Sequence, residues 1–231
     1  PLDSWDALIL AMTKKGYTKS ELLDAGLAVQ NRNGGLYDKF RNRLMFPVID
    51  VRGDVVAFGG RVLDKSEPKY MNSQETPVYS KRRVLYGLNL AKKSKRPNII
   101  LCEGNIDVVT LHQAGFDNAV ASMGTALTVE QTRLLSRFTK ELVLCYDNDN
   151  AGKIATERAL EILNNPEFSV KVLQLPRRRT EDGELVKQDA DDFIKFQGKD
   201  AFEALLSGSE NGIEFRMAQV AGKYDLTNDE A

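Results

Sequence analysis

Two apolar runs in the sequence each end in carboxylates. The first run is followed by Glu103 and Asp107, and the second by Asp147 and Asp149. Carboxylates that a fold brings together repel one another: at an effective dielectric near 20, a pair about 5 Å apart costs roughly 3 kcal/mol. Such a cluster needs either protons or a hard cation. Because oxygen ligands of this kind suit Mg²⁺ or Mn²⁺, we favour a divalent metal site.

The elements that must position these acids alternate between strand and helix patterns from residue 97 onward. Short runs rich in Ile, Leu and Val between helical segments predict a parallel sheet that is buried on both faces and has right-handed crossovers. Ligands of such sheets bind outside the carboxyl ends of the strands, so the four acids should converge on one rim. We expect strands at residues 98–103, 117–121, 141–146 and 169–174, and helices at 106–115, 128–137 and 151–164.

Further acids follow the last of these strands. A polar loop over residues 177–188 leads to Asp189 and Asp191 and then into a short helix. Acids placed directly before a helix are often N-caps, because their oxygens accept the free N–H groups of the first turn. Judged on these residues alone, capping is the preferred interpretation of the pair.

The N-terminal part predicts a mixture of helix and strand. Residues 4–15 have a helical apolar pattern, and Thr18 with Glu21 forms a capping-box pattern that begins a second helix ending at Gly26. Residues 36–63 contain two strand-like runs separated by a turn signal, which predicts an antiparallel hairpin.

Basic and glycine residues in that hairpin are candidates for ligand contact. If the stretch is extended, Arg41 and Arg43 project from one face. Gly59 and Gly60 allow a backbone to approach a ligand closely, although a glycine pair is more often only a turn. The polar stretch over residues 68–83 could hold phosphates, and the sequence lacks the Walker pattern of a P-loop.

The charges of the chain are segregated along its length. The net charge is only −1, but residues 36–96 have 14 Lys and Arg against 6 Asp and Glu, whereas residues 97–231 have 14 against 23. A basic block beside an acidic block favours a polyanion held on one side and a metal on the other.

Composition excludes several other classes of protein. Of 231 residues, 42% are hydrophobic and no 18-residue apolar run or signal peptide is present, so we expect a cytoplasmic protein without membrane contact. One His and two Cys exclude a zinc module. Cys102 and Cys145 lie inside strand patterns, where reduced core thiols are the expected state.

A Glu-Gly after one strand and an Asp-x-Asp after a later strand resemble the Toprim fold of primases, topoisomerases and certain nucleases. Additional motifs extend the resemblance to the RNA polymerase domain of the bacterial DnaG-type DNA primases, over roughly residues 3–225. They comprise residues 41–47, 58–63, 68–73, 85–87, 103–109, 121–128 and 146–152.

This resemblance implies a function and a set of site residues. The implied activity is metal-dependent, DNA-directed synthesis of short RNA primers on single-stranded DNA from ribonucleoside triphosphates, in the bacterial cytoplasm at the replication fork. Glu103 is implied as the acid/base carboxylate. The metal-holding acids are implied to be Glu103, Asp107, Asp147, Asp149, Asp189 and Asp191. For Asp189 and Asp191, the resemblance makes metal binding the preferred interpretation and helix capping the minority one. The nucleotide- and template-binding residues are implied to be Arg41, Arg43, Arg61, Lys69, Asn72 and Lys81.

The resemblance also implies a division of the chain. We expect an α/β fold with a basic αβ subdomain over residues 1–96, a Toprim catalytic subdomain over 97–207 and the start of a helical subdomain over 208–231. Zinc and the replicative helicase are expected to bind through modules outside this chain. The sequence departs from the family pattern at Asn105, Ile106 and Ala190 and in a longer loop over 177–188, which affects local geometry and nucleotide preference.

Three other functions remain open. The same acids serve strand cleavage in Toprim nucleases and topoisomerases, although no domain with a tyrosine nucleophile is evident. Aspartate-dependent phosphatases also have Asp-x-Asp after a strand, but they require Thr or Val where Ala151 stands. A non-catalytic nucleic-acid-binding module whose acids only organise the rim is the third alternative.

Overall fold

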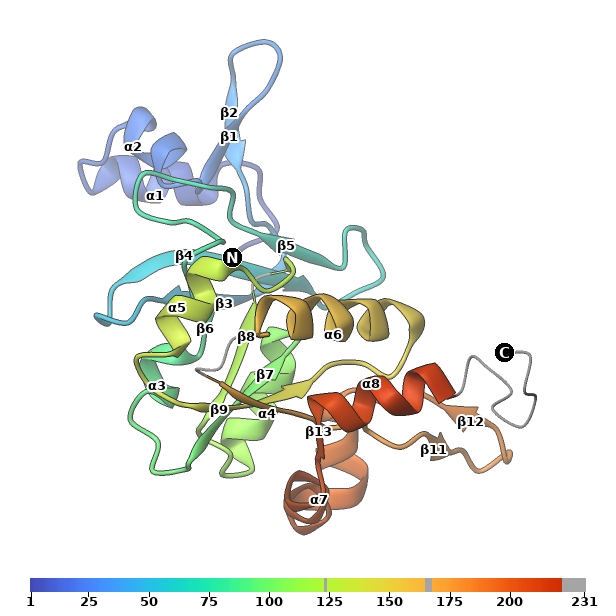
Figure 1. Ribbon diagram of the computed structural model, residues 1–231. Helices are drawn as coiled ribbons and strands as arrows, with labels where there is room; N and C mark the ends of the chain where they lie inside the picture. The colour runs from blue at the N-terminus through green and yellow to red at the C-terminus, as the bar shows by residue number, and fades with distance from the viewer. Residues whose placement is uncertain (123, 165–167, 222–231) are drawn as a thin grey trace.

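The computed structural model describes residues 1–122, 124–164 and 168–221 (Figure 1). The N-terminal elements occupy the top of Figure 1, a three-stranded sheet lies below them, and a larger sheet covered by helices forms the rest of the molecule. Within the described ranges, no helix has both the length and the apolar character needed to cross a membrane.

The predicted N-terminal helix pair is present as α1 (Ala7–Lys14) and α2 (Lys19–Asp24). The capping box is confirmed, since the Glu21 N–H donates to Thr18 Oγ1 and the Thr18 N–H donates to the Glu21 carboxylate. A small antiparallel hairpin, β1 (Ala28–Gln30) and β2 (Leu36–Asp38), follows. Asp38 at its end accepts the N–H groups of Leu8 and Ile9, so a residue distant in sequence caps α1.

The predicted hairpin is confirmed as β3 (Arg43–Ile49) and β4 (Val55–Val62), and β5 (Tyr70–Asn72) pairs with the outer edge of β4. The turn interpretation of Gly59 and Gly60 is wrong, because both residues lie inside β4. They fit there because neighbouring side chains fill the space above them. A Cβ on Gly60 would lie 3.0 Å from carbons of Arg43 and Phe40.

The central sheet has six strands in the order β13-β10-β9-β7-β8-β6. Its four inner strands are parallel, as predicted, and comprise β7 (Asn98–Cys102), β8 (Ala119–Ser122), β9 (Glu141–Cys145) and β10 (Ser169–Val172). The two edge strands were not predicted. They are β6 (Leu85–Tyr86) and β13 (Glu210–Asn211), both antiparallel to their neighbours.

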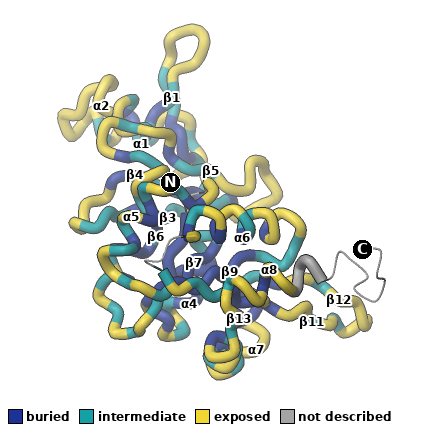
Figure 2. Tube along the Cα trace, in the orientation of Figure 1, coloured by how far each residue is buried: buried dark blue, intermediate teal, exposed yellow. Residues whose placement is uncertain are grey.

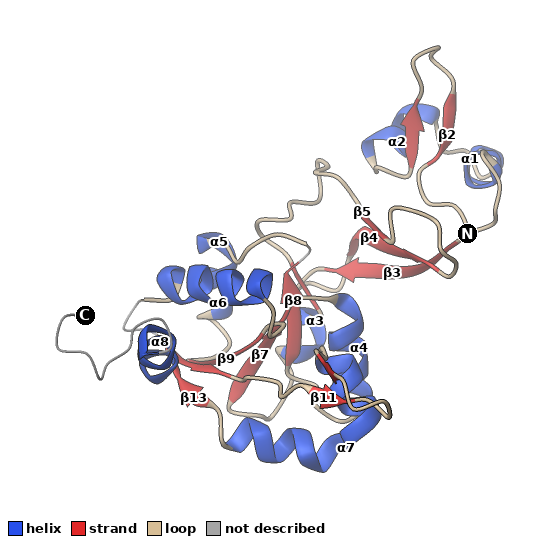
Figure 3. Cartoon of the chain, turned by 90° about the vertical axis from the view of Figure 1, so that its right-hand side faces the viewer, coloured by secondary structure: helices blue, strands red, loops and turns tan. Residues whose placement is uncertain are grey.

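Helices cover both faces of this sheet (Figure 3), and its inner strands are largely buried (Figure 2). Successive strand residues alternate between two cores. Ile99 and Leu101 contribute to the core on one face, whereas Ile100 and Cys102 contribute to the core on the other. The first face is covered by α3 (Leu88–Ala91), α5 (Val129–Leu135), α6 (Asn150–Ile162) and α8 (Gly212–Ala221), and the second by α4 (Asn105–Gln113) and α7 (Ala190–Ser207).

The strand order explains where a ligand can bind. The chain leaves β7 through α4 to reach β8, then returns past β7 through α5 to reach β9 and continues through α6 to β10. Because parallel crossovers are right-handed, a reversal of direction places α4 on one face and α5 and α6 on the other. The adjacent strands β7 and β9 thus send their helices to opposite faces, which creates a crevice at their carboxyl ends.

The segment after β10 is more ordered than a polar loop. It contains a short hairpin of β11 (Arg178–Arg179) and β12 (Leu185–Val186). The helix that follows Asp189 is longer than expected and has a break at Gly198, where φ is 84°. In the segment over residues 208–231, where the start of a helical subdomain is expected, the structure has α8, and residues 222–231 lie outside the described residues.

Both cysteines are buried and free, as expected. Cys102 and Cys145 are directly paired positions of β7 and β9; Glu103 directly follows the first, and Asp147 lies two residues after the second. A hydrogen bond with Cys145, together with burial, raises the pKa of the Cys102 thiol.

Candidate active site

Glu103 and Asp147 meet at the crevice between β7 and β9. Each follows the end of its strand, and Glu103 Oε1 accepts the backbone N–H of Asp147 at 3.0 Å. This bond joins the Glu-Gly and Asp-x-Asp motifs, which are 44 residues apart. The strand register brings them together, because Cys102 and Cys145 are paired neighbours.

Asp149 begins α6, and a glycine in the first turn fixes its position. Asp149 Oδ1 accepts the N–H of Gly152 at 2.8 Å, as an N-cap does. A Cβ on Gly152 would lie 2.0 Å from the carbonyl oxygen of Asp147, so only glycine lets the helix pass this close to the strand end. The second Asp149 oxygen contacts Lys187 Nζ at 2.6 Å.

A second group of acids lies beside the first, across the ends of α4 and α7. Asp107 Oδ2 accepts the N–H of Gly104 at 3.1 Å, and its Oδ1 accepts the N–H of Asp191 at 3.2 Å. The side chain of Asp191 is buried and accepts hydrogen bonds from Thr110 Oγ1 and from Lys195 Nζ, each at 2.5 Å.

Asp189 does act as an N-cap, because its Oδ1 accepts the N–H of Asp192 at 2.7 Å. Oxygens of Asp189, Asp191 and Asp192 nevertheless lie within 4.8 Å of one another, so capping and metal binding are compatible here. Ala190, where the family pattern has proline, is buried in the first turn of α7.

Burial and mutual repulsion make the charged forms of these acids costly. Burial, with the charges of Asp189 and Asp147, raises the pKa of Asp107 to about 7. The pKa of Asp147 is raised to about 6 by burial and, among the neighbouring charges, mainly by that of Glu103. The pKa of Glu103 is raised mainly by burial. Asp149 is the exception, since its hydrogen bond to Lys187 lowers its pKa.

This donor set fits a divalent cation. The oxygens are carboxylates, the ligand type of Mg²⁺ and Mn²⁺. The raised pKa values of Asp107 and Asp147 come first from burial and then from the negative charges of neighbouring acids, which a bound cation would offset. The acids form two adjacent groups, one of Glu103, Asp147 and Asp149 and one of Asp107, Asp189, Asp191 and Asp192.

A cavity of about 600 Å³ lies in front of the acids and has walls of opposite charge. One wall contains the carboxylates. The facing wall comes from β4 and β5 and contains Arg61, Lys69 and Asn72. The cavity therefore lies between the basic and acidic blocks of the sequence, and a polyanion bound with cations would suit both walls.

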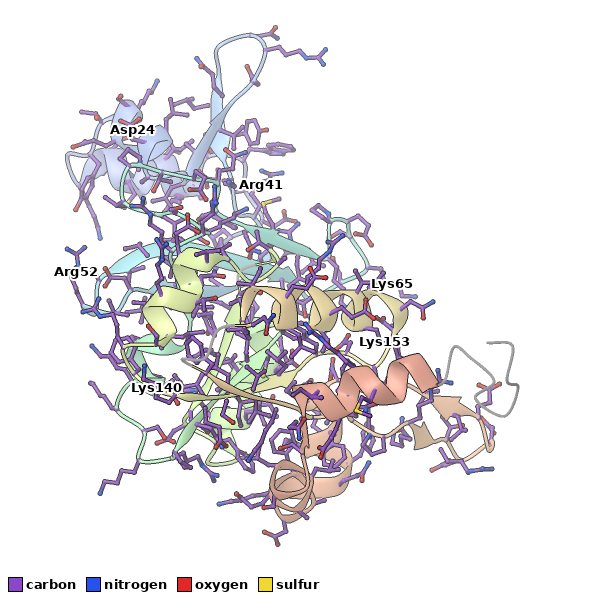
Figure 4. The ribbon with its side chains drawn as sticks, viewed as in Figure 1. Asp24, Arg41, Arg52, Lys65, Lys140 and Lys153 are labelled. Atoms are coloured by element: carbon purple, nitrogen blue, oxygen red, sulfur yellow. The ribbon has the colours of Figure 1, made fainter. Side chains whose placement is uncertain are left out.

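The predicted basic residues do not all reach this cavity. Arg41 lies beside the N-terminal helices (Figure 4), where its guanidinium stacks on Trp5, 4.0 Å from the ring centroid. The extended geometry that would align Arg41 with Arg43 is absent, because Asn42 has a φ of 45° and β3 begins only at Arg43. Arg43 donates to the Pro68 carbonyl at 2.8 Å and so holds the segment before β5.

Lys81 also lies away from the cavity. Its backbone joins the polar segment to the central sheet, since its carbonyl accepts from Gln131 Nε2 of α5 at 2.9 Å and its N–H donates to Glu75 at 2.7 Å. The structure thus brings Arg61, Lys69 and Asn72 together with the acids, and it places the other three predicted basic residues on supporting segments.

Several residues that we did not predict contribute to the site. Lys187 and Lys195 neutralise individual acids, and Thr110 fixes Asp191. Only the Lys195 pair had a sequence signal, its i,i+4 spacing from Asp191. Asn105, a departure from the family pattern, lines the cavity, and its Nδ2 lies 2.9 Å from the position of a Cβ on Gly59.

Two family models match the chain. The model described as the DNA primase catalytic core, N-terminal domain, matches residues 1–92, and a Toprim-like model matches residues 100–194. The two matches meet near the boundary between the basic and acidic blocks of the sequence.

Curated and solved relatives agree with these models. The chain is 44% identical over 230 residues to the DNA primase of Clostridium acetobutylicum, covering 99% of this chain and 37% of that protein. It superimposes on the Escherichia coli primase catalytic core with a TM-score of 0.84 at 37% identity, covering 99% of this chain and 72% of that one. A DnaG primase catalytic domain bound to single-stranded DNA matches with the same TM-score at 36% identity, covering 98% and 72%.

Proposed function

The chain belongs to the family of bacterial DNA primases, and we propose on that basis that it is the core of a DNA-directed RNA polymerase that makes short primers. The cavity of opposed charge carries the proposal, because nucleotidyl transfer brings a triphosphate and a metal-binding acid cluster together. The chain spans 37% of the length of the Clostridium relative, so the activity of the whole enzyme is inferred from these residues.

The acids have distinct proposed roles. A divalent cation, Mg²⁺ or Mn²⁺, supplies neutralisation of phosphate charge and activation of the attacking hydroxyl when it is bound. Asp107, Asp147, Asp149, Asp189 and Asp191 would hold it. Glu103 is half-buried and its pKa is raised, which supports a role as the proton acceptor from the 3′-hydroxyl.

The facing wall would bind the nucleotide. Arg61 and Lys69 provide charges that can contact the triphosphate, and Asn72 provides an amide at the same wall. The proposed template is single-stranded DNA, the ligand named for one of the solved relatives. Arg41, Arg43 and Lys81 would act less directly, because they fix the segments that carry this wall and its connection to α5.

The cellular setting follows from the same proposal. A primer-making enzyme works at the replication fork, so we expect it in the bacterial cytoplasm. A replicative helicase partner is expected through a region outside these residues and stays a prediction.

The test combines single-stranded DNA, labelled ribonucleotides and Mg²⁺ or Mn²⁺ with the chain and with its Asp147→Asn variant. Short RNA from the parent and none from the variant is the expected result. Arg52→Ala is the control, because Arg52 is exposed on the β3–β4 turn and its ion pairs, among the residues that the structure describes, are with Asp50 and Asp54 of that turn. Shortened DNA without RNA would instead indicate the nuclease alternative, and template binding without either product would indicate the non-catalytic module.

A further inference from the structure

Lys187 occupies the cation position on one of the proposed metal ligands. Its Nζ lies 2.6 Å from Asp149 Oδ2, while Asp149 Oδ1 accepts the N–H of Gly152. The oxygen that the helix leaves available for a metal is therefore the one that the lysine contacts. An ammonium and a divalent cation cannot both take this oxygen at close range without strong repulsion.

The backbone around Lys187 is fixed, but its side chain can move. The next residue, Gln188, is buried, and its Nε2 donates to the Pro176 carbonyl at 2.7 Å, which ties the end of the β11–β12 hairpin to its beginning. The Lys187 side chain itself is 60% exposed. The lysine can thus leave Asp149 for solvent without any rearrangement of the fold.

The second lysine of the site differs in this respect. Lys195 contacts Asp191 from the same helix, four residues later, and Thr110 contacts the other Asp191 oxygen. Removal of that lysine would leave Asp191 buried with only a hydroxyl partner. Asp149 is less buried than Asp191, and its bond from the Gly152 N–H does not depend on Lys187. Lys187 therefore balances the charge of Asp149 but is not needed to hold Asp149 in position.

We propose that Lys187 is a built-in competitor for the divalent cation. It balances the charge of Asp149 when no metal is bound, and it sets the metal concentration at which Asp149 takes up the cation. The inference rests on the metal-binding part of the proposed function, but it does not require that the chain polymerise nucleotides.

The test measures binding of Mn²⁺ alone, by titration calorimetry or electron paramagnetic resonance. Lys187→Met and Lys187→Gln should bind Mn²⁺ roughly fivefold more tightly, which corresponds to loss of a competing exposed ion pair worth about 1 kcal/mol. Lys187→Arg keeps the charge and should stay near the parent. Tighter binding of Mn²⁺ by these variants cannot result from damage to the fold, because such damage would weaken metal binding.

Lys153→Met is the matched control. Lys153 lies on α6, one turn beyond Asp149 (Figure 4), is exposed and makes no ion pair with any residue that the structure describes. The Lys153→Met variant removes one positive charge near the site without removing a contact to Asp149. If the direct contact of Lys187 with Asp149 matters, this variant should change the affinity for Mn²⁺ less than twofold.

Unchanged or weaker binding in both Lys187→Met and Lys187→Gln, or an equal gain in Lys153→Met, would overturn the proposal. Asp149→Asn separates this failure from a failure of the proposed function. If that variant binds Mn²⁺ as the parent does, Asp149 is not a metal ligand, and both the competition and the proposed metal-binding role of Asp149 are wrong. If it loses affinity while Lys187 variants gain none, only the competition is wrong.

Discussion

The backbone N–H of Asp191 donates to Oδ1 of Asp107 at 3.2 Å, across 84 positions of sequence. This bond joins the first turn of α7 to the first turn of α4 and so unites acids from opposite ends of the Toprim-like segment. Burial and neighbouring negative charges raise the pKa of Asp107, and this bond opposes part of that rise because an N–H donor stabilises the charged carboxylate.

The free energy of unfolding without metal should fall as pH rises. The pKa of Asp107 is about 7 and that of Asp147 about 6 in the folded protein, both above the ordinary value of 3.8. The folded state therefore binds the protons of these two carboxyl groups more tightly than the unfolded state does. Their stabilising contribution is complete below about pH 4 and is lost by about pH 7, on the order of 4 kcal/mol for Asp107.

Thermal melts in EDTA from pH 4.5 to 8 would measure this loss. Added Mg²⁺ should stabilise the protein increasingly over the same range, because the cation binds only the ionised acids. The Asp107→Asn, Asp147→Asn double variant is the control and should show a flatter pH profile. An equally steep profile in the double variant would assign the dependence to other groups.

Gly152→Ala should disrupt the site. The added Cβ would lie 2.0 Å from the Asp147 carbonyl oxygen and 3.0 Å from Glu103 Oε1, so the start of α6 must move. We expect a loss of about 2–4 kcal/mol in the free energy of unfolding and loss of Mn²⁺ binding.

Gly208→Ala is the matched control for that substitution. Gly208 follows α7 with a φ of −94°, and its Cβ would meet only ordinary contacts from 3.7 Å, so the change should be within about 0.5 kcal/mol. Denaturant unfolding of both variants checks the pair. A Gly152→Ala protein that is as stable as the parent would contradict the close passage of α6 over the strand end.

Arg61→Ala should weaken nucleotide binding without unfolding the protein. Arg61 lies on the cavity wall opposite the acids, and loss of one phosphate contact should raise the Kd for a ribonucleoside triphosphate about tenfold, as a charged hydrogen bond of about 1.5 kcal/mol implies. Fluorescence titration with a labelled nucleotide in Mg²⁺ measures it. Arg52→Ala, which removes the same charge from the exposed β3–β4 turn, should leave the Kd unchanged. Equal effects from both would mean that only net charge matters.

Arg41→Ala should act mainly on stability. The Arg41 guanidinium stacks on Trp5 and donates to the Asp38 carbonyl at 2.6 Å, so its loss should cost about 1–2 kcal/mol in the free energy of unfolding. Nucleotide affinity should change far less than in Arg61→Ala. Parallel urea melts and nucleotide titrations distinguish the two effects, and a Kd change as large as that of Arg61→Ala would place Arg41 at the nucleotide.

Local patterns were sufficient for the parts of this protein that depend on local physics. Apolar runs, helix caps and the turn at Arg52-Gly53-Asp54 predicted the parallel strands, most helices and the β3–β4 hairpin, because backbone propensity and burial act over a few residues. The convergence of Glu103 and Asp147 was also predictable, since carboxyl ends of parallel strands share one edge.

Only the tertiary structure decided which charges meet. Three contacts join residues from different parts of the chain: Lys187 with Asp149, Arg41 with Trp5, and Asn105 with Gly59. The periodicity of a strand or helix contains no information on such partners. The short edge strands β6 and β13 were missed for the same reason, because two residues acquire strand geometry only by pairing with a neighbour already in place. The sequence therefore determined the acidic edge of the sheet, and long-range packing determined which basic side chains face it.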